Sequence, residues 1–86
     1  ILRPIIEYDK NRGTDLIMTL FYYSRFNKSV SYVSKKLNIH TNTLYQRVKK
    51  IEELLGYSLD DPMDWFDIQA ASIMYGLIYT DLITKL

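Results

Sequence analysis

Residues 29–55 read SVSYVSKKLNIHTNTLYQRVKKIEELL, and this stretch predicts two helices joined by a short turn. In its first part, four side chains recur at i, i+3, i+4 and i+7 on one helical face: Val30, Val33, Ser34 and Leu37. In its second part, an apolar stripe recurs at i, i+4, i+7 and i+11: Leu44, Val48, Ile51 and Leu55. Two helices joined this tightly are typical of a helix-turn-helix, whose second helix lies in the DNA major groove.

The residues that flank the two predicted helices fit their ends. Ser29 is placed to cap the first helix, because its hydroxyl can accept hydrogen bonds from free amides. Asn38 tolerates a left-handed backbone and can therefore turn the chain. We expect Thr41 to cap the second helix, with Asn42 as the alternative, and Gly56 to end it.

Charge is concentrated on the same stretch. Between residues 25 and 50 there are seven basic side chains and no acidic one, whereas the remaining residues hold four basic and ten acidic side chains. The net charge of the chain is only +1, but its charges are unevenly distributed, with a basic stretch at residues 25–50 and an acidic remainder. A basic patch on the candidate recognition unit is what phosphate binding requires, although a charge run alone is more often a solvated face.

The rest of the chain predicts further helices and no strand. We expect an N-terminal arm or helix at 1–12, a scaffold helix at 14–26 begun by Thr14 or Asp15, and a C-terminal helix at 62–84. Asp61-Pro62 is a strong start for the last one, since an acidic cap precedes a proline at the first helical position. The predicted fold is all-α, a small helix-turn-helix bundle of about four to five helices forming a single domain over 1–86.

The predicted last helix is apolar around most of its circumference, which indicates either full enclosure or a partner. We expect an interface with a second subunit or with another region of the same protein, formed by Trp65, Phe66, Met74, Tyr75, Ile78 and Tyr79. The alternative is that Trp65 and Phe66 fill the core. A homodimer would place two recognition helices about 34 Å apart, one turn of DNA.

Composition argues against several other classes of protein. The 86 residues contain no cysteine and one histidine, so neither a thiolate metal site nor a cysteine nucleophile is expected. Caps and first-turn acids account for the aspartates at 60–67, and the glycines are isolated, so we predict no enzyme, cofactor or metal. No apolar run reaches the ~18 residues of a membrane span, and we expect a cytoplasmic protein without a membrane partner.

Residues 37–44 (LNIHTNTL), followed by Arg47-Val48, Ile51-Glu52 and Leu55-Gly56, resemble the C-terminal helix-turn-helix of the PucR/CdaR family of bacterial regulators. The resemblance extends to segments on both sides: Leu2-Arg3-Pro4, Glu7-Tyr8-Asp9, Gly13-Thr14-Asp15-Leu16 with Thr19-Leu20, and Leu59-Asp60-Asp61-Pro62. It implies a DNA-binding output domain, Fis-like in its docking. It also implies an N-terminal sensory region in the same protein, and this chain, which does not begin with Met, is then expected to be a C-terminal fragment.

The chain departs from the family pattern at positions that matter for specificity. The family usually has Arg where Thr41 and Tyr45 stand, Tyr where Gln46 stands and Arg where Trp65 stands. Two arginines that could bind guanine bidentately are therefore missing, and the family's sequence preference does not transfer.

These patterns together predict sequence-specific binding of double-stranded DNA, with residues 41–55 in the major groove. The residues expected nearest the bases are His40, Thr41, Asn42, Tyr45 and Gln46. The residues expected at phosphates or the backbone are Lys28, Lys35, Lys36, Thr43, Arg47, Lys49 and Lys50. The alternative is a helical protein-interaction or dimerisation module that has lost DNA binding.

Overall fold

The computed structural model describes the backbone of residues 1–85 and the side chains of residues 1–78. Its elements are α1 (Arg3–Arg12), α2 (Leu16–Arg25), α3 (Val30–Leu37), α4 (Thr41–Leu55) and α5 (Pro62–Lys85). Over the described residues the protein is all-α, which confirms the predicted fold class. None of these helices combines the length and hydrophobicity that crossing a membrane requires.

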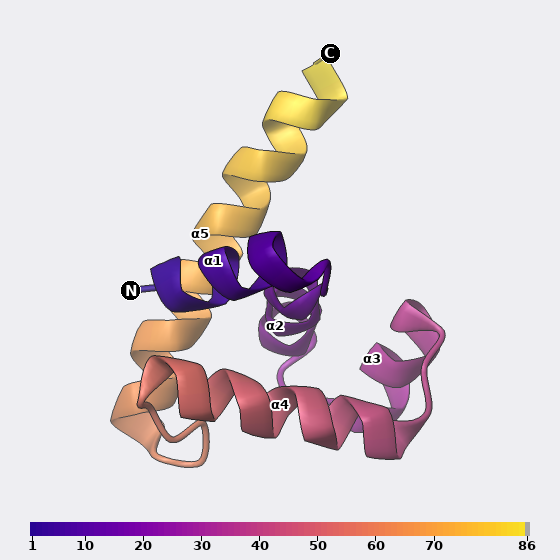
Figure 1. The fold of residues 1–86 in the computed structure, drawn as a ribbon, viewed down its shortest axis with the longest axis vertical. Coiled ribbons are helices and arrows are strands. Elements are labelled where there is room, and N and C mark those ends of the chain that lie inside the picture. The colour runs from indigo at the N-terminus through magenta and orange to yellow at the C-terminus, as the bar shows by residue number, and fades with distance from the viewer. Residues whose placement is uncertain (86) are drawn as a thin grey trace.

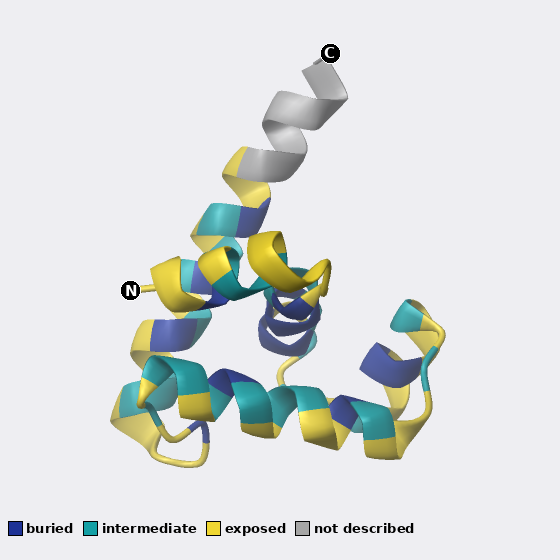
Figure 2. Ribbon diagram, viewed as in Figure 1, coloured by how far each residue is buried: buried dark blue, intermediate teal, exposed yellow. Residues whose placement is uncertain are grey.

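Helix α2 is the centre of the bundle, since it contacts each of the other four helices. Figure 2 shows it as the most continuously buried helix, behind α1 and above α4. The core contains side chains with no exposed surface from all five helices, for example Ile5, Leu20, Val33, Ile51 and Ile68. Burying an aliphatic side chain of this size contributes about 1.5–3 kcal/mol, so this shared core determines where α4 and α5 lie.

A carboxylate from α1 caps the start of α2. Asp9 accepts hydrogen bonds from the backbone N–H groups of Leu16 at 2.8 Å and Ile17 at 2.9 Å, and from the Thr14 hydroxyl at 2.5 Å. Asp15 occupies the N-cap position, but its side chain makes no capping bond. Asp15 therefore stands at the predicted N-cap position, but the expected side-chain cap from Thr14 or Asp15 was wrong, because Asp9 of the preceding helix binds the free amides instead.

The turn between α3 and α4 has the predicted backbone and an unexpected cap. Asn38 is left-handed with φ 56°, and Gly56 ends α4 with φ 70°, as predicted. His40, not Thr41, caps α4: its Nδ1 accepts from the Asn42 N–H at 3.1 Å. Ser29 stands at the N-cap position of α3 without a capping bond. The bounds of α4 match the predicted 41–55, but the Thr41 cap was wrong, because Thr41 is the first residue of the helix and the cap is the residue before it.

Helix α5 crosses α2 and continues past α1 (Figure 1). It begins as predicted, since Asp61 Oδ1 accepts from the N–H groups of Met63 and Asp64 at 2.9 and 3.0 Å. A Cβ built on Gly76 would lie 1.9 Å from Phe21 Cδ1, so the absence of a side chain lets the Phe21 ring lie against α5. Ser72 donates to the Ser24 hydroxyl at 2.5 Å on the same contact face.

Candidate nucleic-acid interface

Helix α4 has a buried side and an open polar side. It runs along one edge of the molecule (Figure 1), with Leu44 and Ile51 turned inward and fully buried. The opposite side carries exposed polar side chains, and Tyr45 is 55 % exposed. Four of the five residues predicted to lie nearest the bases are therefore solvent-facing side chains of this helix: Thr41, Asn42, Tyr45 and Gln46. The fifth, His40, is exposed just before the first turn.

His40 has a structural role that limits what else its ring can do. Accepting the Asn42 N–H at Nδ1 requires that this nitrogen carry no proton. In the neutral ring the proton then lies on Nε2, which becomes a hydrogen-bond donor. His40 therefore has one nitrogen that fixes the start of α4 and one that is available to an acceptor such as a base or a phosphate.

The basic residues fall into two groups. Lys35 and Lys36 in the last turn of α3, and Lys49 in the middle of α4, are exposed. Lys50 is half-buried: its ammonium lies 3.3 Å from Glu53 Oε1 and 5.2 Å from the centre of the Tyr8 ring. A surface ion pair of this kind contributes at most about 1 kcal/mol, so Lys50 can exchange Glu53 for a phosphate at little cost.

Lys28 and Arg47 are engaged within the protein. The Lys28 ammonium donates to the Leu59 carbonyl and lies 4.6 Å from the centre of the Trp65 ring. Arg47 Nη1 donates to Thr19 Oγ1 on α2 at 3.1 Å. Both side chains are half-buried, so both would have to leave these partners to reach a phosphate.

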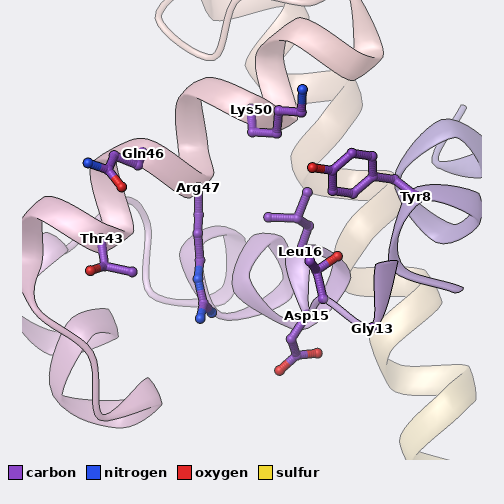
Figure 3. A pocket seen from close by; sticks show the side chains of 9 residues that line it. Tyr8, Gly13, Asp15, Leu16, Thr43, Gln46, Arg47 and Lys50 are labelled. Carbon is purple, nitrogen blue, oxygen red and sulfur yellow. The ribbon is translucent and has the colours of Figure 1, made fainter. Parts of the chain in front are cut away.

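A cleft of about 410 Å³ separates one flank of α4 from the α1–α2 turn (Figure 3). The α4 side contributes Thr43, Gln46, Arg47 and Lys50, and the other side contributes Tyr8, Gly13, Thr14, Asp15 and Leu16. Partial burial raises the pKa of the Asp15 carboxyl above 3.8, the Asp9 carboxylate raises it further, and Arg47 opposes both effects. This carboxylate makes the far wall of the cleft less favourable for a phosphate than the α4 side.

Tyr45 faces the other flank of α4. Burial raises the pKa of the Tyr23 hydroxyl above 10.0, and the neighbouring Asp60, Tyr45 and Glu52 add to the increase. Glu52 also accepts the Leu59 N–H at 2.9 Å, which holds the α4–α5 loop against α4. Tyr45 therefore stands at the border between the open face of α4 and the loop that leads into α5.

Some of the residues predicted to form an interface are exposed in the structure, and others pack against the core. Phe66, Met74 and Ile78 are 68 %, 63 % and 61 % exposed. Trp65 is half-buried and meets the Tyr23 ring edge-on at 5.8 Å, and Tyr75 packs against the core. Trp65 therefore follows the core alternative, whereas Phe66 does not. The side chain of Tyr79 lies outside the described residues.

The sequence did not indicate two contributors to the site. Asp9 holds the start of α2, and Tyr8 lies beside Lys50 and also beside Arg12, whose guanidinium is 5.2 Å from the centre of the same ring. Both residues act across a helix–helix contact. Tyr8 and Lys50 are far apart in the sequence, so no local sequence pattern predicts that they lie together.

Comparison with known proteins identifies the family. Residues 16–74 match the family described as the PucR C-terminal helix-turn-helix domain. The chain is 40 % identical over 63 residues to the purine catabolism regulatory protein of Bacillus subtilis (strain 168), a match that covers 73 % of this chain and 12 % of that protein. It is 31 % identical over 67 residues to the DNA-binding transcriptional activator AdeR of the same organism, covering 78 % of this chain and 16 % of that protein. No solved structure matches.

The chain thus spans less than a fifth of the length of either relative. The matched region contains α2, α3, α4 and the first half of α5, which is the unit described above. This chain belongs to the family of PucR C-terminal helix-turn-helix domains.

Proposed function

We propose that this domain binds double-stranded DNA as the output domain of a transcriptional regulator, with α4 in the major groove. The observation that carries the proposal is the open side of α4, which is polar and solvent-facing. Its residues from Thr41 to Lys50 end a stretch of 26 residues without an acidic side chain. Family membership and the names of the two relatives support the same function. The family is a class of DNA-binding domains and not a class of enzymes.

The contacts divide into two kinds. Side chains proposed to reach base edges are Tyr45, Gln46, Asn42 and Thr41, with His40 contributing its Nε2–H. Side chains proposed to reach phosphates are Lys35, Lys36, Lys49 and Lys50, with Thr43 beside the backbone. Lys28 and Arg47 are proposed mainly to brace the domain, because their partners are within it.

Three further aspects of the function are proposals of the same kind. They are sequence-specific reading of the groove, a preceding sensory region in the same protein and a cytoplasmic location. A homodimer is also proposed, and its surface is argued in the next subsection. Thr41 and Tyr45 stand where the family usually has arginines, which can bind guanine bidentately. We therefore propose that the DNA sequence preferred by this domain depends less on guanine than is usual in the family.

The test is fluorescence anisotropy on a pool of randomised duplex DNA at about 50 and about 200 mM salt. Four phosphate contacts give a slope of about −3.6 in log K against log salt, so affinity should fall by about a hundredfold between these concentrations. The Lys49→Ala/Lys50→Ala variant should lose about half of that slope. A matched control, Arg3→Ala/Lys10→Ala, removes two exposed charges from α1 and should change little.

Absence of binding at the lower salt concentration, or equal losses in the two double variants, would contradict the proposal. Where binding is present, selection from the same pool separates the two kinds of contact. Lys49→Ala should weaken all sequences about equally, whereas Tyr45→Ala should change which sequences are enriched.

A further inference from the structure

The outer side of α5 is apolar although it is exposed. Five side chains on it are more than half exposed: Met63, Phe66, Met74, Leu77 and Ile78. They form a stripe with the exposed Ala70, and the opposite side of the same helix packs on α2 through Ile68, Ser72 and Gly76. A helix with apolar residues on both sides buries only one of them within this domain.

The spacing of the stripe from Met63 to Leu77 is symmetric. Positions 63, 66, 70, 74 and 77 are separated by steps of three, four, four and three, so the pattern is the same when read from either end. Its centre is Ala70, the smallest side chain in the stripe, which allows two helices to approach closely. A second copy running antiparallel would set Phe66 against Met74, Met63 against Leu77 and Ala70 against Ala70.

We propose that α5 pairs with α5 of a second copy of this chain, antiparallel, about a two-fold axis at Ala70. This deepens the homodimer of the proposed function and does not depend on DNA. Each contact in such a pair occurs twice, as an isologous interface requires. The stripe from 63 to 78 has a length of about 22 Å along the helix axis, enough for one layer of side chains at the two-fold axis and two layers on each side of it to interdigitate.

The exposed area sets the upper limit of such an interface. Complete burial of the exposed parts of the five large residues would cover about 700 Å² on each copy and about 1,400 Å² in the pair, and this maximum lies within the range of specific interfaces. The stripe is also richer in Met and aromatic surface than an ordinary exposed helix, which is typical of interface cores.

Charge favours the antiparallel orientation over the parallel one. The first turns of α5 carry Asp61, Asp64 and the exposed Asp67. In a parallel pair these carboxylates would meet their own copies, and like charges at such distances repel. In the antiparallel pair Asp67 lies opposite Ile73, and Asp61 and Asp64 of the two copies lie at opposite ends of the interface. The two helix dipoles are then antiparallel, which is favourable.

The test is analytical ultracentrifugation of this chain without DNA. We expect a dimer for the wild type, and a loss of at least a hundredfold in dimer affinity for Phe66→Lys. Phe66→Lys/Met74→Glu should restore the dimer to within about tenfold, because in the antiparallel register each introduced lysine meets an introduced glutamate of the partner, at two symmetric places.

The matched control is Phe66→Lys/Met63→Glu, which has the same charges in the wrong register and should stay monomeric. All of these positions are exposed, so their effect on the stability of the monomer should stay within about 0.5 kcal/mol, and thermal unfolding checks this. A monomeric wild type would show that the stripe does not bind a second copy of the chain, and this result would overturn the proposal. A dimer that survives Phe66→Lys, or equal behaviour of the two double variants, would overturn it as well. Either result would leave the DNA-binding proposal standing.

Discussion

Helices α4 and α5 both dock on α2 with a fully buried isoleucine, Ile51 in α4 and Ile68 in α5, and they differ on the side turned away from it. The outer side of α4 is polar, with Gln46 and Lys49, whereas that of α5 is apolar, with Phe66 and Met74. The inner sides determine the fold. The outer sides determine which chemistry each helix offers to a partner: a polar surface with a basic residue on α4 and an apolar surface on α5.

The largest expected effect tests whether the two inner sides are equivalent. Ile51→Ala and Ile68→Ala should each lower the free energy of unfolding by about 2–5 kcal/mol, because each leaves a cavity in a packed core. Urea denaturation followed by circular dichroism measures both. The exposed controls Gln46→Ala and Asp67→Ala should stay within about 0.5 kcal/mol of the wild type. A much smaller loss at Ile51 would mean that α4 is only loosely docked.

The next effect concerns the glycine of each helix. Gly76→Ala should destabilise by about 1–3 kcal/mol, since its Cβ would meet the buried Phe21 ring, although alanine is the better helix former. A Cβ added at Gly56 would have no atom within 4 Å, so Gly56→Ala introduces no clash. It should lower the free energy of unfolding by about 1–2 kcal/mol, because alanine is strained in the left-handed backbone conformation of this residue. Phe21→Leu should relieve the first loss and leave the second unchanged. Thermal melts of the two double variants check this, and a stabilising Gly76→Ala would refute the close contact.

The two caps differ in strength, and their removal should show it. Asp61→Ala removes two hydrogen bonds and a negative charge at the start of α5, for an expected loss of about 1–2 kcal/mol. His40→Ala removes one bond at the start of α4 and should cost about 0.5–1 kcal/mol. His40→Asn is the control, because asparagine is a good cap and should restore stability. If His40→Ala weakens DNA binding and His40→Asn recovers only stability, the ring itself contacts DNA.

The smallest effect concerns Asp15, beside the α4 flank. The raised pKa of its carboxyl means that the folded state binds this proton more tightly than the unfolded state does. Stability should therefore fall slightly as the pH rises from 3.8 through the folded pKa and stay lower at neutral pH. Asp15→Asn should be slightly more stable than the wild type at neutral pH and equal to it below 3.8, with a small difference because the side chain is exposed. Chemical denaturation across this pH range would show an opposite sign if Arg47 dominates.

Features that depend on a few neighbouring residues were predictable from the sequence. The periodicity of Leu44, Val48 and Ile51 predicted α4, and Asn38, Gly56 and Asp61 predicted where helices end or begin. These signals are local, because a helix repeats every 3.6 residues and a cap acts within one turn.

Features that depend on packing between distant residues were not predictable. Asp9 replaces the expected cap of α2, and Lys28 and Arg47 bond to partners 31 and 28 residues away. For α5 the sequence showed apolar residues on all sides but not which side faces inward. The choice is made by Phe21 and Tyr23 on α2, which meet Gly76 and Trp65 and leave Phe66 outside.

The open side of α4 also has a consequence for how such domains diverge. Within the described side chains, those of Thr41, Asn42, Tyr45, Gln46 and Lys49 make no hydrogen bond to the rest of the protein and do not belong to its buried core. The bonds that hold α4 in place come from His40, Arg47 and Glu52. Mutations at the five outer positions can therefore accumulate one at a time, each in a folded protein. Under the proposed function, a lineage can then exchange one DNA target for another without first acquiring compensating changes in its core.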